Sequence, residues 1–267
     1  MYNRCVNAAP TELVLLAVAN EAASAAAAEL TPRFGHRQAD VRAKSTPTDL
    51  VSEADVAAEA AIRRVLADHR PDDAILGEEG GATDGDGGLR WVIDPLDGTI
   101  NFLFGIPQFA VSVACEDSEG ALVGVVLDPI RDERFTASRS GPAELHGAPI
   151  RASGSDDLAT ALVATGFGYE ADLRSRQAEV LSRVLPQVRD IRRAGAAALD
   201  LCWTACGRYD AYYERGLKPW DRAAGGLIVE RAGLSLRPLQ AVGDDPEGLL
   251  AAPSALVEEL LALVLGR

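Results

Sequence analysis

The stretch at residues 91–102 constrains this chain more than any other. It reads Trp-Val-Ile-Asp-Pro-Leu-Asp-Gly-Thr-Ile-Asn-Phe. Its apolar start is typical of a buried strand, and Asp94 and Asp97 fall where we expect that strand to stop and the chain to turn. Two carboxylates on one rigid turn suit hard cations such as Mg²⁺, which prefer oxygen ligands. Gly98 allows a ligand close to the backbone, and the amides that follow would face an anion. The stretch therefore predicts metal-assisted phosphoryl chemistry.

Length and charge narrow the classes of protein. The chain has 267 residues, 48% of them hydrophobic, which is enough for a core in one large domain or two lobes. It carries 26 basic and 40 acidic residues, a net charge of −14. Such a surface repels nucleic acid and anionic membranes, so we expect neither as a partner. It also repels phosphate, so a phosphate site in this chain needs bound cations to reverse the local potential.

The cysteines and the chain's apolar segments bear on its compartment. Cys5, Cys115, Cys202 and Cys206 have no spacing typical of a disulfide framework, which indicates a reducing environment. No secretory signal pattern opens the chain, and no apolar run reaches the length of a membrane span. We therefore expect a soluble, cytoplasmic protein.

Apolar periodicity and breaker residues predict alternating helices and strands. Helices are expected at residues 11–30, 52–69, 174–185, 196–205, 220–232 and 254–265. Strands are expected at residues 74–77, 109–116, 121–127, 133–137, 158–165, 188–191, 210–213 and 249–252. Residues 80–88, rich in Gly and Asp, read as a mobile solvated loop. This order indicates helices layered on sheets, with an N-terminal metal-binding α+β lobe (1–150) and a C-terminal α/β lobe (151–267) that completes the active site, or one domain that contains both.

Acidic residues stand at the ends of several predicted elements: Glu78, the pair Asp94 and Asp97, Glu214 and Asp221. A carboxylate that follows an apolar strand destabilises the fold unless a cation neutralises it. Taken singly, each could be a helix cap or a solvated turn residue. The hexapeptide at residues 94–99 is more specific, because it combines a strand end, two carboxylates and a Gly-Thr pair.

The ordered motifs resemble those of the inositol monophosphatase family. The matching pieces are Gly-Glu-Glu at residues 77–79, the stretch at 91–102, and residues 207–226 with Asp-Ala-Tyr-Tyr-Glu and Trp-Asp. Lys-Ser-Thr-Pro-Thr-Asp-Leu-Val at residues 44–51, followed by Asp55, is similar to the family's N-terminal element. The resemblance implies a layered α/β/α/β/α sandwich of the fructose bisphosphatase type and a homodimer. Residues 237–248 have no recognisable match.

The resemblance also implies a metal set and a catalytic set. Carried over residue by residue, Glu78, Asp94, Asp97, the carbonyl of Leu96 and Asp221 would hold two or three Mg²⁺ ions. Glu78 and Thr99 would position and deprotonate the attacking water. Asp55, together with Lys44, would organise a mobile loop and the water network.

A third set would bind the substrate. The amides of Gly98 and Thr99 would receive the phosphate, and the amides of Gly195, Ala196 and Ala197 would line the sugar side of the pocket. Glu214 would hydrogen-bond a substrate hydroxyl, with Asp221 beside it. Ala196 stands where family members more often carry Ser or Thr, so a side-chain contact is expected to be missing there.

The function that the resemblance implies is Mg²⁺-dependent hydrolysis of myo-inositol 1-phosphate and related polyol phosphates, with lithium sensitivity. Histidinol phosphate is the alternative substrate. A bisphosphate substrate would need additional cations near the pocket, for which Arg192, Arg193 and Lys218 are the candidates. A catalytically weak regulatory binding protein on the same fold is the alternative from another class. Mg²⁺-dependent turnover discriminates it from an enzyme.

Overall fold

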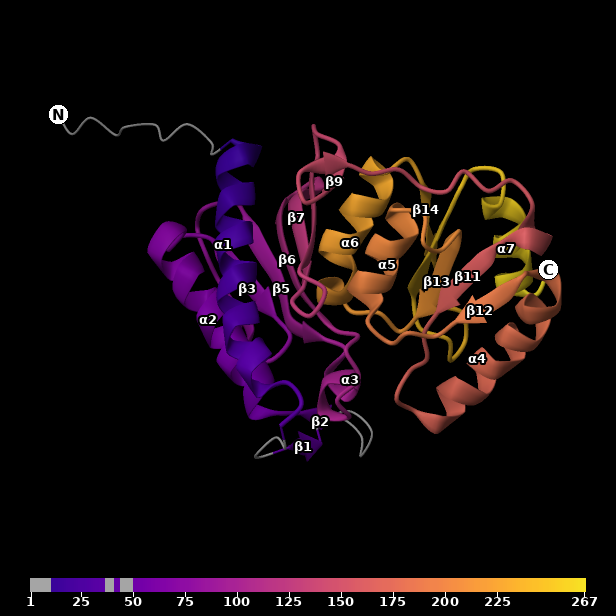
Figure 1. Cartoon of the computed structure of the whole chain (residues 1–267), viewed down its shortest axis with the longest axis horizontal. Helices are drawn as coiled ribbons and strands as arrows, with labels where there is room; N and C mark the ends of the chain where they lie inside the picture. The colour runs from indigo at the N-terminus through magenta and orange to yellow at the C-terminus, as the bar shows by residue number, and fades with distance from the viewer. Residues whose placement is uncertain (1–10, 37–40, 44–49) are drawn as a thin grey trace.

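The computed structural model arranges the chain in alternating layers of helix and sheet, and it describes residues 11–36, 41–43 and 50–267. One helical layer covers an eight-stranded sheet, a second helical layer separates that sheet from a five-stranded one, and a third helical layer covers the far side (Figure 1). The chain therefore adopts the α/β/α/β/α sandwich that the resemblance implied.

The elements have the following bounds. The α-helices are α1 (Glu12–Leu30), α2 (Glu53–His69), α3 (Thr99–Leu103), α4 (Ala171–Val184), α5 (Ala197–Ala205), α6 (Pro219–Arg231) and α7 (Val257–Leu265). The first strands are β1 (Arg42–Ala43), β2 (Leu50–Val51), β3 (Ala74–Gly77), β4 (Gly81–Thr83), β5 (Arg90–Asp97), β6 (Ala110–Asp117), β7 (Gly120–Asp128) and β8 (Glu133–Ser138). The remaining strands are β9 (Ala143–Leu145), β10 (Ala148–Pro149), β11 (Leu162–Thr165), β12 (Asp190–Arg192), β13 (Ala211–Arg215), β14 (Ser235–Leu239) and β15 (Gly248–Ala252).

The larger sheet places the acidic strand β5 near its centre. Its strand order is β10-β9-β8-β7-β6-β5-β3-β4, and every neighbouring pair is antiparallel except β3 with β5. Because β3 and β5 run parallel, their carboxyl ends meet at one edge of the sheet. This brings Glu78, which follows β3, to the same edge as Asp94 and Asp97 at the end of β5. α1 and α2 pack against the outer face of this sheet.

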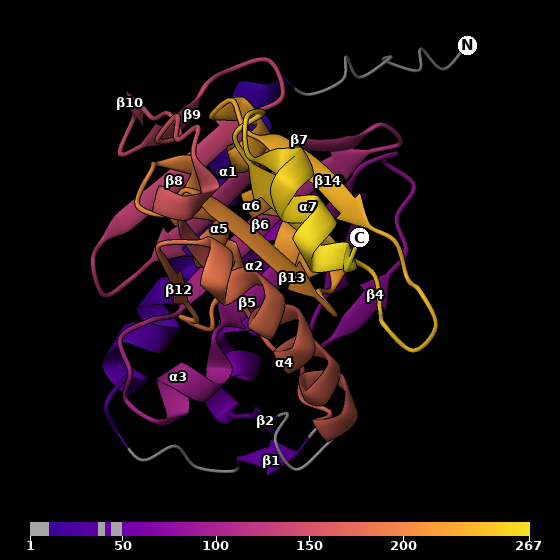
Figure 2. The same ribbon diagram turned by 90° about the vertical axis from the view of Figure 1, so that its right-hand side faces the viewer.

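The smaller sheet has the order β12-β11-β13-β15-β14, with β11 parallel to both of its neighbours. α5 and α6 lie between the two sheets, and α4 and α7 cover the outer face, nearest the viewer in Figure 2. One cluster of buried apolar side chains spans the middle layer and reaches both sheets, from Val92 on β5 to Tyr212 on β13. The middle helices therefore fix the position of one sheet against the other.

Capping residues explain where the first two helices begin. The Thr11 side chain accepts a hydrogen bond from the Val14 amide at the start of α1, as the sequence predicts. Ser52 and Asp55 form a capping box at the start of α2. The apolar spacing in this helix predicts an inner face made of Val56, Ala60, Ile62, Val65 and Leu66, and this prediction is partly wrong, because Val56 and Ala60 are exposed. The buried face includes two charged residues, Asp55 and Glu59, which an apolar count overlooks.

Three expectations about strands and loops need correction. The Gly- and Asp-rich segment at residues 80–88 contains β4, because Gly81–Thr83 pairs with β3. Residues 158–160 form a 3₁₀ turn capped by Asp157, so the strand begins only at Leu162. The edge strand β14 was not predicted, since its Arg237 and Pro238 obscure the alternation. The hairpin expected around residues 41–44 lies partly outside the described residues, but β1 pairs with β2.

The segment Glu12–Arg33, which contains α1, is long and apolar enough by composition to cross a membrane, contrary to the expectation that no run reaches that length. In this fold it belongs to the outer helical layer and buries one face against the large sheet. Its Leu15, Val18, Ala22 and Ala26 are buried in a cluster with β5, β6 and β7. The apolar composition of α1 is therefore explained by packing against the sheet.

Two adjacent glycines in α6 provide a test of the middle layer. A Cβ on Gly225 would lie 2.8 Å from Leu201 Cδ1 and 2.9 Å from Leu201 Cβ on α5, whereas one on Gly226 would meet only Leu236 Cδ2, at 3.4 Å. We expect Gly225→Ala to lower the free energy of unfolding by about 1–3 kcal/mol through overpacking. Gly226→Ala should be neutral or stabilising by up to about 1 kcal/mol, because Ala favours helix. Urea unfolding of both variants measures the difference; equal effects would contradict the close α5–α6 contact.

Candidate active site

The end of β5 is irregular, and this irregularity positions its carboxylates. β5 pairs regularly with β6 up to Asp94, and the register shifts between Asp94 and Asp97. The Leu96 amide donates to Asp94 Oδ1 at 3.0 Å, which folds the chain back on itself. The strand extends through Asp97 instead of stopping before it, but the bulge still directs its last residues out of the ladder.

Asp97 ties the first sheet to the middle layer. Its Oδ1 accepts from the Ala197 amide at 3.1 Å, and its Oδ2 accepts from the Ala198 amide at 2.7 Å. These amides belong to the first turn of α5, where N–H groups lack partners within the helix. A carboxylate is favourable there because the helix dipole is positive at this end. Residues 100 positions apart thus meet at one point.

Gly98 and Thr99 follow in a tight turn. Gly98 has φ of 95°, and a Cβ there would lie 2.9 Å from the Gln108 carbonyl oxygen, so both the conformation and the space require glycine. Thr99 Oγ1 lies within donating distance of Asp55 Oδ1 (2.9 Å) and of the Leu96 carbonyl oxygen (3.0 Å). Asp55 is buried and also accepts from the amide and hydroxyl of Ser52. The cap of α2 therefore orients the Thr99 hydroxyl.

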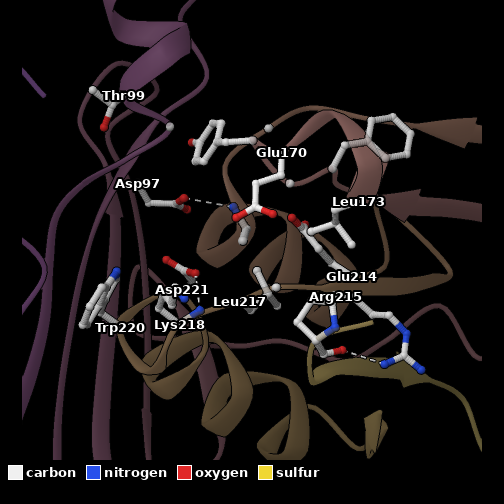
Figure 3. Close-up of a pocket in the computed structure, with 18 of the residues that line it drawn as sticks. Asp97, Thr99, Glu170, Leu173, Glu214, Arg215, Leu217, Lys218, Trp220 and Asp221 are labelled. Atoms are coloured by element: carbon white, nitrogen blue, oxygen red, sulfur yellow. Dashed lines mark hydrogen bonds between the residues drawn. The ribbon is translucent and has the colours of Figure 1, made fainter. Parts of the chain in front are cut away.

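A cavity of about 440 Å³ opens over these residues, between the edge of the large sheet and the ends of β11 and β13. Figure 3 shows Asp97, Asp221 and Glu214 projecting toward this space from different elements. The cavity is lined by most of the residues that the sequence nominated: Glu78, Asp94, Leu96, Asp97, Gly98, Thr99, Gly195, Ala197, Glu214 and Asp221.

Two nominated residues do not line the cavity, and one is not described. Asp55 lies behind Thr99, and among the described residues that line the cavity it contacts the Thr99 hydroxyl. Ala196 is fully buried; its Cβ lies 3.2 Å from where a Cβ of Gly98 would stand. Its side chain packs under the turn, so only its backbone could reach a ligand. Lys44 lies outside the described residues.

The acidic side chains repel one another because they are buried together. Burial, with Glu78 and Asp97 nearby, raises the pKa of Asp94 well above its usual range. Burial raises the pKa of Asp97 to about 7 although the two α5 amides lower it, and burial with Asp97 beside it raises the pKa of Asp221 to about 8. The pKa of Glu214 rises to about 7, again mainly through burial. A bound cation would relieve this repulsion.

The donor set therefore fits a hard cation, although it does not form a closed cage. Within residues 11–36, 41–43 and 50–267, no three acidic, His or Cys side chains come close enough together to hold a metal ion. The lining carboxylates of Glu78, Asp94, Asp97 and Asp221 are all oxygen donors, as Mg²⁺ prefers. Burial raises the pKa values of Asp94, Asp97 and Asp221, which indicates a site that gains stability when positive charge enters.

Sequence reasoning missed the residues that support the site from behind. The buried Glu59 carboxylate accepts from the Glu79 and Gly80 amides, both at 2.8 Å, and so fixes the loop that carries Glu78. Tyr212, fully buried on β13, donates its hydroxyl to Glu214 Oε2 at 2.5 Å. A charged residue on the inner face of α2 is a signal that could have revealed Glu59. No local signal distinguishes Tyr212 from an ordinary core residue.

Gly166, which follows β11, leaves the space that Glu214 occupies. A Cβ at this position would lie 2.0 Å from Glu214 Oε2, so no other residue allows the observed carboxylate position. Glu214 is therefore fixed on one side by the Tyr212 hydroxyl and on the other by bare backbone. A side chain held so firmly can select among substrate hydroxyls.

Comparison with known proteins identifies the class of the fold and site. The model of the inositol monophosphatase family matches residues 12–264. The inositol-1-monophosphatase SuhB of Mycobacterium tuberculosis is 44% identical over 241 residues, 86% of this chain and 83% of its own length. The Nus factor SuhB of Pseudomonas aeruginosa is 48% identical over 191 residues, 69% of this chain and 70% of its own.

Solved structures of related proteins have the same fold as this chain. The SuhB extragenic suppressor protein of Bartonella henselae superposes with a TM-score of 0.86 at 35% identity, covering 94% of this chain and 98% of that one. An inositol monophosphatase of Thermotoga maritima has a TM-score of 0.83 at 28% identity, covering 96% and 98%. The chain belongs to the inositol monophosphatase family. The family consists of phosphatases that are generally metal-dependent and act on small phosphate esters.

The raised pKa values predict how stability depends on pH without divalent ions. The unfolded chain loses the protons of these carboxyl groups near their ordinary pKa of about 4, whereas in the folded protein Asp97, Glu214 and Asp221 lose theirs at about pH 7 to 8. Between these two pH values the folded state binds more protons than the unfolded chain. Stability should therefore fall as pH rises through this window. In EDTA, we expect the melting temperature to drop by at least about 3 °C from about pH 5 to about pH 8.

Added Mg²⁺ should recover that loss at the higher pH and have a smaller effect at the lower one, because binding requires ionised carboxylates. Differential scanning calorimetry at both pH values, with and without Mg²⁺, makes the comparison. A melting temperature that rises with pH in EDTA would show that these groups are not repelling one another.

Proposed function

We propose that this protein is a Mg²⁺-dependent phosphomonoesterase that hydrolyses myo-inositol 1-phosphate and related polyol phosphates. One observation carries the proposal: a single cavity joins a group of repelling carboxylates at one end to a rigidly held hydrogen-bond acceptor, Glu214, at the other. The first end suits metal and phosphate, and the second suits the hydroxyls of an alcohol.

Glu78, Asp94, Asp97, Asp221 and the carbonyl of Leu96 would hold two or three Mg²⁺ ions. When bound, the ions would supply positive charge to the phosphate and the leaving oxygen and would acidify the attacking water. With a net charge of −14 on the chain, this charge is also needed to bring a phosphate ester into the cavity.

Thr99 and Glu78 would handle the water. A hydroxyl that donates its hydrogen to Asp55 keeps its lone pairs free to accept from a water molecule in the cavity. Thr99 would orient that water, and Glu78, which lines the same cavity, would take its proton. Asp55 contributes by keeping the Thr99 hydroxyl in this orientation.

The phosphate and the alcohol would occupy different parts of the cavity. The amides of Gly98 and Thr99 would face the phosphate, because they begin α3 and have no partners within it. Gly195 and Ala197 also line the cavity and would contact the alcohol, although the Ala197 amide already donates to Asp97. Glu214 would accept a hydrogen bond from one of its hydroxyls, with Asp221 nearby.

Other aspects of the proposal rest on the family and the composition. We propose a soluble, cytoplasmic homodimer, inhibited by lithium, whose partner is a small phosphate monoester and not nucleic acid or membrane. The N-terminal part, 1–150, would supply most of the metal carboxylates, and 151–267 would supply Glu214 and Asp221. The excess of acidic over basic residues supports this choice of partner.

The same test of activity distinguishes two alternative functions. Histidinol phosphate would use the same carboxylates with a different alcohol. A regulatory role is suggested by relatives such as that of Pseudomonas aeruginosa, which is named a Nus factor. Retention in this chain of Thr99 and of each side-chain carboxylate that the resemblance assigns to the metals favours catalysis.

The first test measures phosphate release from myo-inositol 1-phosphate and from histidinol phosphate across a Mg²⁺ titration. We expect Mg²⁺-dependent turnover with a preference for the inositol ester. Asp94→Asn should reduce turnover of that ester by at least about 100-fold, because it removes a proposed metal ligand. Its circular dichroism and melting temperature serve as the control for folding.

Preference for histidinol phosphate would keep the metal mechanism and change the substrate. Turnover by Asp94→Asn at the level of the unmodified protein would remove Asp94 from the metal set. Absence of turnover with either ester would favour the regulatory role.

The second test concerns Glu214. Glu214→Ala should raise KM for myo-inositol 1-phosphate by about 10-fold or more, the value of a lost hydrogen bond to a charged group. It should change KM for 4-nitrophenyl phosphate much less, because that ester offers no alcohol hydroxyl to Glu214. Steady-state kinetics with both esters makes the comparison, and equal increases in KM would place Glu214 outside the alcohol pocket.

A further inference from the structure

Three arginines line the cavity, and two of them are engaged with the protein. Arg176 donates to Asp245 Oδ1 and to the Asp244 carbonyl, both at 2.7 Å. Arg215 donates to the carbonyl oxygens of Gln240 (2.9 Å) and Pro246 (2.7 Å). These guanidinium groups hold the cavity wall together and have fewer N–H groups left for a ligand.

Arg193 is the third, and it differs from both. Within the described part of the chain its side chain has no hydrogen bond or ion pair, although a guanidinium carries several donors in a rigid fork. Its neighbour Arg192 makes an ion pair with Asp190, at 2.6 Å, and is not part of the cavity wall. Two adjacent arginines therefore have different environments, and only the unpaired one borders the cavity.

The backbone leaves room for the Arg193 side chain. Gly195 has φ of 88°, and a Cβ there would lie 2.4 Å from Arg193 Nη1, so the guanidinium lies directly over the Gly195 backbone. Gly195 itself lines the cavity. Glu214 lines the same cavity. Burial raises the pKa of Glu214, while the Tyr212 hydroxyl and, to a smaller extent, the charge of Arg193 lower it. Arg193 and Glu214 therefore border one cavity, and the positive charge of Arg193 acts on Glu214.

We propose that Arg193 is a specificity residue that donates hydrogen bonds to hydroxyl oxygens of a polyol leaving group, while Glu214 accepts from a neighbouring hydroxyl of the same group. The inference rests on the proposed function and adds a second contact to the alcohol. A donor and an acceptor facing one region match a pair of hydroxyls, because each hydroxyl can both donate and accept.

A second anionic group on the substrate suits this region less well. Acidic side chains outnumber basic ones around the cavity, and both Glu170 and Glu214 are among its lining residues (Figure 3). An anion placed beside Arg193 would also be near Glu214 and would be repelled by it. A neutral polyol avoids this repulsion and still uses both charged groups.

The experiment compares Arg193→Met with the matched control Arg192→Met. Each is tested on myo-inositol 1-phosphate, on glycerol 2-phosphate and on 4-nitrophenyl phosphate, which has no alcohol hydroxyls. We expect Arg193→Met to raise KM for the two polyol esters by about 10-fold, with kcat within about threefold, because the contact is made equally in the ground and transition states. KM for the aryl ester should change by less than about threefold, and Arg192→Met should resemble the unmodified protein.

Three results would overturn the inference. Equal losses on the aryl and polyol esters would mean that Arg193 acts on the phosphate. Equal losses in both arginine variants would mean a general effect of surface charge. A larger loss on 2-phosphoglycerate than on glycerol 2-phosphate would mean that the guanidinium binds an anion.

The two proposals can fail separately. Hydrolysis of glycerol 2-phosphate without hydrolysis of myo-inositol 1-phosphate would contradict the proposed substrate while still testing Arg193. Normal hydrolysis of both by Arg193→Met would contradict the role of Arg193 alone. Because Arg193 is exposed, both variants are expected to fold, and melting temperatures verify this.

Discussion

The two hydrogen bonds from the first turn of α5 to Asp97 are the interaction on which the rest of the site depends. They join the end of a strand in the large sheet to a helix that lies between the two sheets. The buried apolar cluster of the middle layer fixes the two sheets against each other, and these two bonds fix the Asp97 carboxylate within that frame. Burial raises the pKa of Asp97 although these two bonds lower it, so holding this carboxylate in the interior has an electrostatic cost that the bonds only partly offset.

Several buried side chains behind the cavity hold the charged groups of the site in position. Asp55 caps α2 and holds the Thr99 hydroxyl, Glu59 holds the loop after β3, and Tyr212 holds Glu214. All three side chains are buried. Asp55 and Tyr212 form hydrogen bonds with side chains that line the cavity, and Glu59 forms hydrogen bonds with the loop that carries Glu78. A site made of mutually repelling charges needs such support, because repulsion would otherwise move the side chains apart.

The sequence predicted the parts of this arrangement that depend on local pattern. The helices and the main strands follow from periodicity and caps, and Asp94 and Asp97 stand out because strand, carboxylates and glycine are contiguous. The supporting residues could not be found in this way. Glu59 lies on a helix whose inner face was read as wholly apolar, and Tyr212 looks like any buried aromatic. Arg192 and Arg193 have nearly the same local sequence, and only the tertiary fold separates the paired one from the one at the cavity.

Small residues are as important to the cavity as charged ones. The missing side chains of Gly98, Gly166 and Gly195 make space for the Gln108 carbonyl, the Glu214 carboxylate and the Arg193 guanidinium respectively. A phosphate that enters this cavity is repelled by the lining carboxylates and by the net charge of −14 on the whole chain. Cations bound by the carboxylates would correct this at the phosphate end only. At the alcohol end we propose that Arg193 supplies positive charge. Its guanidinium lies over the Gly195 backbone, has no hydrogen bond or ion pair among the residues that the structure describes, and leaves Glu214 able to accept from a hydroxyl.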